Sequence, residues 1–125
     1  MYTIRIEADF AAAHFLAHYF GKCENIHGHN YRVRVWLKGE SLDEGGMLAD
    51  FGCVKQCLKQ VIAPLDHSNL NDIPYFAGDP SAERIACHIF EQMQASLSDF
   101  SVESGLLSAV DVFETPTNMA RFGSI

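Results

Sequence analysis

The sequence lacks any apolar run approaching the roughly 20 residues that a membrane-spanning helix needs. It also lacks a basic start followed by a short apolar segment, so we expect no signal peptide and a protein of the cytoplasm. Basic residues are scarce, with nine Lys and Arg against sixteen Asp and Glu, and the net charge is −7 with His neutral. Such an acidic chain without a basic stripe repels polyanions, so we expect neither a nucleic-acid nor a membrane partner.

Cysteine occurs only four times. Without a secretion signal, four reduced thiols are expected rather than a disulfide framework. Cys53 and Cys57 lie on the apolar face of one predicted helix and Cys87 lies inside another, so these three are interpreted as small core residues. Cys23 differs, because its polar neighbours in a loop disfavour core packing.

The chain has 125 residues, enough for a single domain, residues 1–125, with one hydrophobic core. Apolar and polar side chains alternate from Tyr2 to His14 and from about His29 to Leu37, which predicts two strands. Apolar residues then recur at helical spacing behind two predicted N-caps, Asp50 and Ser81. Residues 106–115 return to strand, and the tail after residue 116 has room for a short last strand.

This order of elements predicts an α+β fold, in which two helices cover one face of a four-stranded antiparallel sheet. Such a sheet has two open edges and an uncovered face, and open edges invite pairing with another chain. We therefore predict a homo-oligomer in which the sheet continues from one subunit into the next.

A histidine pair is the sharpest chemical feature of the sequence. His27 and His29 lie two residues apart around Gly28, so on an extended segment both imidazoles point the same way and can meet one ion. His14 supplies a third ligand if the two strands lie side by side. Three neutral imidazoles with an open fourth position are typical of catalytic zinc. We therefore predict a Zn²⁺ site at His14, His27 and His29 rather than three surface histidines.

Cys23 has three interpretations. It could be a fourth zinc ligand, an inert buried thiol, or a reactive thiol activated by the neighbouring cation. A fourth protein ligand would close the site and indicate a non-catalytic, zinc-stabilised module, so the ligand count separates the two classes of function.

Two further acidic positions carry possible chemistry. Asp66 and His67 follow the first predicted helix directly, and an adjacent acid and imidazole can form a proton relay, although a plain turn is the alternative. Glu114 has the parity of the apolar residues of its strand, so its carboxylate needs a cationic or multi-donor partner, either an Arg or the guanidine-like edge of a ligand. His18 and His88 are interpreted as structural or solvated.

Taken together, these motifs resemble the 6-pyruvoyl-tetrahydropterin synthase and 6-carboxy-tetrahydropterin synthase family. The resemblance covers nearly the whole chain and rests on the order and spacing of six segments, namely residues 10–14, 23–31, 46–51, 65–71, 80–83 and 114–117. It implies the tunnelling T-fold, in which subunits join their sheets into a barrel as a trimer or a stacked hexamer. The roles that it implies are zinc ligation by His14, His27 and His29, general-base catalysis by Cys23, an opposing proton relay by Asp66 and His67, and pterin anchoring by Glu114.

The substrate implied by the resemblance is 7,8-dihydroneopterin triphosphate. The spacing from Cys23 to His27 is similar to the bacterial 6-carboxy branch, which releases acetaldehyde and triphosphate on the route to queuosine. Glu24 follows the cysteine, however, and a glutamate near this place is the base in a related branch that forms 6-hydroxymethyl-dihydropterin for folate. We rank the 6-carboxy reaction first, the folate-directed cleavage second and the 6-pyruvoyl reaction third.

The triphosphate of this substrate is strongly negative, whereas the chain is net acidic. Four basic residues could gather at a subunit junction to meet it: Lys22, Arg5, Arg32 and Arg34. The sequence does not choose among them.

Overall fold

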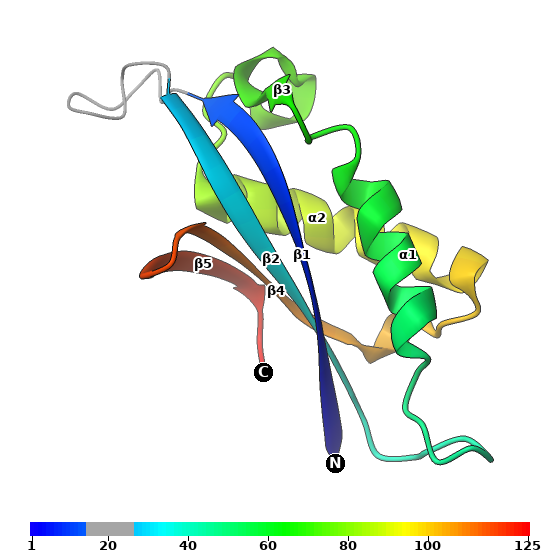
Figure 1. The fold of residues 1–125 in the computed structure, drawn as a ribbon. Coiled ribbons are helices and arrows are strands. Elements are labelled where there is room, and N and C mark those ends of the chain that lie inside the picture. Colours follow the sequence, from blue (N-terminus) through cyan, green and yellow to red (C-terminus); the bar gives the residue numbers. More distant parts are fainter. Residues whose placement is uncertain (15–26) are drawn as a thin grey trace.

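The computed structural model describes residues 1–14 and 27–125, and of His27 the backbone alone. Cys23 and Glu24 therefore lie outside the described residues. The elements are β1 (Tyr2–His14), β2 (His27–Gly39), α1 (Phe51–Ile62), β3 (Ser68–Asn69), α2 (Ala82–Ser96), β4 (Leu107–Thr115) and β5 (Asn118–Gly123), with short 3₁₀ turns between them (Figure 1). No helix in this described part is long and apolar enough to cross a membrane.

The strands form one sheet in the order β3-β1-β2-β4-β5. The four long strands are antiparallel neighbours, as predicted, and the α+β class is confirmed. The structure adds β3, which pairs with the end of β1 in parallel and makes the sheet five-stranded. Two residues are too few to show a period in the sequence, which is why the prediction missed this strand.

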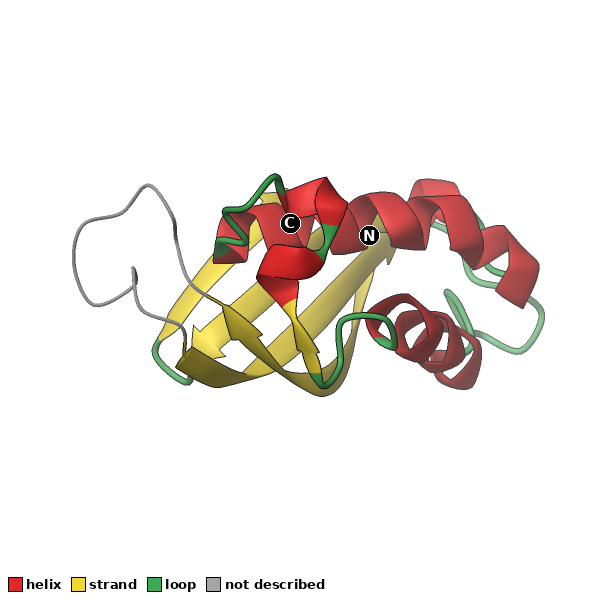
Figure 2. Ribbon diagram, turned by 90° about the horizontal axis from the view of Figure 1, so that it is seen from above, coloured by secondary structure: helices red, strands yellow, loops and turns green. Residues whose placement is uncertain are grey.

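The alternating pattern of the strands places one set of side chains in the core. In β1 the buried residues include Ile6 and Phe10, and in β2 Val33 and Val35 are fully buried. Both helices cover this apolar face of the curved sheet (Figure 2). The layer between sheet and helices is the hydrophobic core, and its upper end, where β1 stops and β2 begins, holds polar side chains instead.

The predicted N-caps begin the two helices. The Asp50 carboxylate accepts hydrogen bonds from the amides of Gly52 and Cys53 at 2.7 and 3.3 Å, and the Ser81 hydroxyl accepts one from the Arg84 amide at 3.2 Å. These contacts satisfy amide groups that a first helical turn leaves without partners. Both helix starts follow the sequence prediction.

The face of the sheet opposite the core carries paired charges. Because β1 and β2 are antiparallel with Glu7 opposite Arg34 and Asp9 opposite Arg32, each guanidinium meets a carboxylate across the strands, at 2.9 and 3.0 Å. Farther along the sheet, the buried Asp111 carboxylate accepts hydrogen bonds from Arg121 at 2.5 and 2.9 Å and from the Trp36 indole at 2.8 Å. Charge on this face is therefore largely neutralised in place.

A candidate metal-binding site at the end of the sheet

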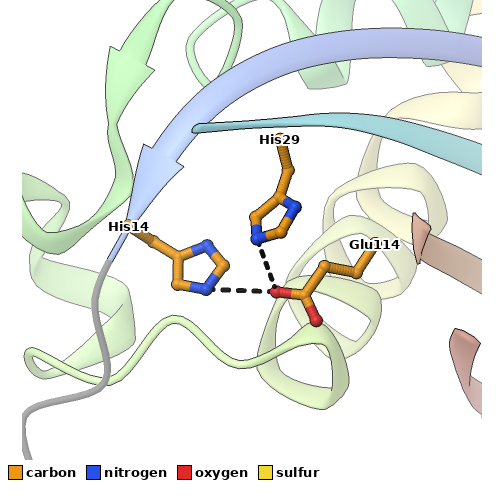
Figure 3. A group of neighbouring side chains, drawn as sticks. All are labelled: His14, His29 and Glu114. Carbon is orange, nitrogen blue, oxygen red and sulfur yellow. Dashed lines mark ion pairs between the residues drawn. The ribbon is translucent and has the colours of Figure 1, made fainter. Parts of the chain in front are cut away.

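Three polar side chains meet where the hydrophobic core ends. His14 is the last residue of β1, His29 lies near the start of β2, and Glu114 lies near the end of β4. Glu114 Oε1 is 3.1 Å from His14 Nε2 and 3.2 Å from His29 Nε2 (Figure 3). The two imidazole rings are stacked, with centroids 5.0 Å apart. Neighbouring strands thus bring together residues that are up to 100 positions apart in the sequence.

The strand register explains why these side chains converge. His14 pairs with His27 and Ala12 pairs with His29, so the histidines of the two strands lie on two rungs of one ladder, with the Ala13–Gly28 rung between them. Side chains two residues apart on a strand share a face, so His14 and His29 both point to the core side. The backbone of His27 belongs to the same ladder, directly opposite His14, while its side chain lies outside the description.

The donor atoms of this cluster suit a divalent metal ion. One ligand atom from each of His14, His29 and Glu114 lies within 4.8 Å of the other two. Imidazole nitrogen and carboxylate oxygen are donors that zinc accepts, and catalytic sites commonly combine them. His14 is 1% exposed, whereas His29 and Glu114 are partly open to solvent. The cluster therefore has a buried back and an accessible front, as a site with an exchangeable position requires.

The predicted acid–imidazole pair forms next to this cluster. His67 Nδ1 lies 3.0 Å from Asp66 Oδ2, so the carboxylate orients the ring. The loop is tied to β1 twice, because the Ala11 amide donates to Asp66 Oδ1 at 2.9 Å and the His67 amide donates to the Ala11 carbonyl at 2.6 Å. The amide bond and the nearby imidazole hold the pKa of Asp66 below its usual value.

These ties hold His67 in an unusual backbone conformation. Its φ is 56°, in the left-handed region that residues with a side chain seldom adopt. The imidazole is largely exposed, and it lines a hollow of about 420 Å³ together with His29 and the last residues of β1. His67 of the pair and His29 of the cluster therefore line one hollow at the end of β1.

A second hollow lies beside Glu114. It measures about 610 Å³ and is lined by Glu114, Phe113 and Thr115 of β4 and by side chains of β1 and β2, among them Arg32 and Arg34. Glu114 belongs both to the histidine cluster and to this larger hollow. A ligand held by its carboxylate would lie directly beside the imidazoles.

Three of the four basic candidates for phosphate contact are already paired, and the fourth, Lys22, lies outside the described residues. Arg32 bonds Asp9, Arg34 bonds Glu7, and Arg5 lies 3.2 Å from Glu7. The sequence analysis did not predict that carboxylates of β1 pair with these arginines. The pairing could have been predicted. The acidic residues of β1 alternate with its apolar residues, the arginines of β2 do the same, and antiparallel pairing sets the two charged faces opposite each other.

The three cysteines of the described part are free, as expected, but they differ in burial. Cys57 is fully buried, which raises the pKa of its thiol to about 11, and Cys53 packs partly against the core. The core interpretation is wrong for Cys87. Its thiol donates to Glu91 at 3.3 Å and accepts from the Tyr75 hydroxyl at 3.6 Å, because its position on α2 is turned away from the sheet.

Comparisons with known proteins point to one family. Residues 3–124 match the family model for 6-pyruvoyl tetrahydropterin synthase. The chain is 37% identical to a 6-carboxy-5,6,7,8-tetrahydropterin synthase of Synechocystis, over 99% of this chain and 95% of that protein. It is 40% identical to the human 6-pyruvoyl tetrahydrobiopterin synthase, over 82% of this chain and 71% of that one. The Caenorhabditis elegans 6-pyruvoyl tetrahydropterin synthase structure superposes with a TM-score of 0.87 at 30% identity, covering 99% and 96% of the two chains.

Proposed function

Because the chain belongs to the 6-pyruvoyl tetrahydropterin synthase family, we propose that it is a zinc-dependent lyase acting on 7,8-dihydroneopterin triphosphate. The proposed products are 6-carboxy-5,6,7,8-tetrahydropterin, acetaldehyde and triphosphate, made in the cytoplasm for queuosine synthesis. The observation that carries this choice is the alignment with a 6-carboxy relative along nearly the full length of both chains.

The zinc ion is assigned to His14, His29 and His27. The close approach of the first two rings and their nitrogen donors supports this assignment, and the backbone register puts His27 on the same ladder. Bound zinc would act as a Lewis acid that acidifies the hydroxyl groups of the substrate side chain. His14 forms the buried wall of the site, which excludes water from one side of it.

Proton transfer is assigned to residues on the two sides of this site. Cys23 is the proposed base that takes a proton from a side-chain carbon of the substrate. Asp66 and His67 handle the hydroxyl protons: Asp66 holds the Nδ1 side of the imidazole, so Nε2 is the nitrogen that meets the substrate. The tie of this loop to Ala11 gives the imidazole a defined place at the end of β1.

Glu114 is the proposed anchor of the pterin ring. A carboxylate can accept two parallel hydrogen bonds from the 2-amino and N3 hydrogens, in the manner of a guanidinium pair. Its position beside both imidazoles and on the larger hollow supports this role, because a ring held there would place the substrate side chain against the metal site.

Two other reactions of the same substrate remain candidates. Glu24 as the base would favour cleavage to 6-hydroxymethyl-dihydropterin on the folate route. The human relative, which is named a 6-pyruvoyl synthase, favours the pyruvoyl product. A zinc-stabilised module without activity is the candidate from a different class.

One assay separates these reactions. The zinc-loaded protein is incubated with 7,8-dihydroneopterin triphosphate, and the pterin product is identified by mass spectrometry. We expect 6-carboxytetrahydropterin, a loss of about 10²–10⁴-fold in rate for Cys23→Ala, and most of that activity retained in Glu24→Ala. If Glu24→Ala loses the activity and Cys23→Ala keeps it, the two roles are reversed and the folate-directed reaction takes first place.

The metal content of variants tests the ligand set. We expect Cys23→Ala to keep its zinc and His29→Ala to lose most of it. Loss of zinc from the cysteine variant would make Cys23 a fourth ligand, which closes the site and favours the structural module.

A further inference from the structure

One side of His14 is occupied by a buried tyrosine. Tyr31 lies two residues after His29 on β2 and is 1% exposed. Its hydroxyl makes a hydrogen bond with Nδ1 of His14. The other nitrogen of that imidazole, Nε2, is the one that lies 3.1 Å from Glu114. His14 is thus held at Nδ1 by a phenol and presents Nε2 to the cluster.

The tyrosine ring is itself firmly placed. It stacks on Phe10, its partner in the β1–β2 register, with centroids 4.8 Å apart and planes 14° apart. It also meets the edge of His29, with centroids 5.6 Å apart. These two ring contacts and the burial of the side chain hold the ring in place, so its hydroxyl lies beside His14.

The hydrogen bond bears on the tautomer of His14. A neutral imidazole binds a metal through the nitrogen that carries no proton, so ligation by Nε2 requires the proton on Nδ1. The Tyr31 hydroxyl oxygen can accept a hydrogen bond from that Nδ1–H. A phenylalanine in its place would leave a buried Nδ1–H facing carbon, and the ring would then favour the tautomer with its proton on Nε2, which cannot bind the ion.

We propose that Tyr31 is a positioning residue of the metal site: when zinc is bound, its hydroxyl accepts a hydrogen bond from Nδ1–H of His14 and fixes the ring so that Nε2 faces the ion. This inference rests on the proposed zinc site. Hydrogen-bond partners on the far nitrogen of a ligating histidine orient the ring and raise its basicity, and their loss typically weakens metal binding about 10–100-fold.

The test compares Tyr31→Phe with a matched control, Tyr75→Phe, in the full chain. Tyr75 also carries a hydrogen-bonded hydroxyl, but its partner is Cys87 on α2. Zinc affinity is measured by competition with a chromogenic chelator, and we expect about 10–100-fold weaker binding for Tyr31→Phe with the control unchanged. Thermal unfolding of both metal-free variants checks that the fold is retained.

Nitrogen-15 NMR of the histidine rings gives a readout that a purely packing role would not move. In the zinc-loaded wild-type protein we expect His14 to carry its proton on Nδ1, hydrogen-bonded to Tyr31, and in zinc-loaded Tyr31→Phe we expect the Nδ1–H signal to move because that bond is lost. The wild-type measurement stands alone if the variant does not fold: zinc bound to Nδ1 of His14 would overturn the inference.

The outcomes separate this inference from the function it rests on. If wild-type protein binds zinc and Tyr31→Phe binds it equally well with an unchanged Nδ1–H signal of His14, the role of Tyr31 is wrong while the zinc site stands. If His14→Ala retains full zinc affinity, the metal site itself is wrong and the role of Tyr31 falls with it.

Discussion

Replacing Glu114 with Gln keeps the shape of the side chain and removes its charge, which separates two roles that the geometry places side by side. The carboxylate lies 3.1 and 3.2 Å from two imidazole nitrogens, as a metal ligand would, and it also lines the larger hollow, as a substrate anchor would. We expect the anchor role, with the zinc ion held by histidines.

The magnitude follows from the hydrogen bonds at stake. A carboxylate that accepts two hydrogen bonds from the pterin edge gains about 1.5–3 kcal/mol from each, because a charged acceptor is involved. A glutamine amide keeps one acceptor and turns a donor toward the second substrate hydrogen. We therefore expect a loss of about 2–4 kcal/mol of transition-state binding, or about 30–1000-fold in kcat/KM. Zinc affinity should change by less than about threefold, because in this assignment Glu114 is not a zinc ligand and its replacement removes none.

The assay measures steady-state kinetics and zinc affinity for Glu114→Gln on the same preparation. Glu103→Gln is the control, since Glu103 is an exposed glutamate that precedes the opposite end of β4. A fall of tenfold or more in zinc affinity with KM unchanged would refute the anchor role and make Glu114 a metal ligand.

Three other predictions concern assembly and stability. Sedimentation at low micromolar concentration should show at least a trimer built by sheet extension, and a stable monomer would contradict it. Burial lowers the pKa of His88 below its usual 6.5 against the opposing effect of Glu91, so below that pH the folded protein binds this proton less readily than the unfolded chain does. The unfolding free energy should therefore fall more steeply from pH 7 to pH 5 in the wild type than in His88→Gln, as urea titrations at each pH would show; equal slopes would disprove this. In the same titrations at neutral pH, Asp111→Ala should lower the free energy of unfolding by about 2–4 kcal/mol, because Arg121 and Trp36 lose a buried acceptor. A loss under about 0.5 kcal/mol would mean that the pairing contributes little to stability.

Local sequence determined the elements and their faces. The period-two alternation of residues 2–14 placed every second side chain of β1 from Ile4 onward toward the core, whereas Tyr2 at the strand start is exposed; His14 follows the same parity into burial. Asp50 and Ser81 marked the helix starts, since a capping side chain acts on amides only two or three residues away. The pairing of β1 with β2 was predictable as well, because strands that are consecutive in the sequence tend to lie side by side.

Only the tertiary structure decided which distant residues share a site. Glu114 reaches His14 and His29 because β4 pairs with β2, a contact over some eighty residues that no local period encodes. The hydrogen bond of Tyr31 to His14 likewise depends on the register of β1 and β2, where a slip of one residue would turn the hydroxyl to the opposite face. Local patterns decide which way a side chain points, whereas the partner it meets depends on strand order and register, and these are set by the packing of the whole core.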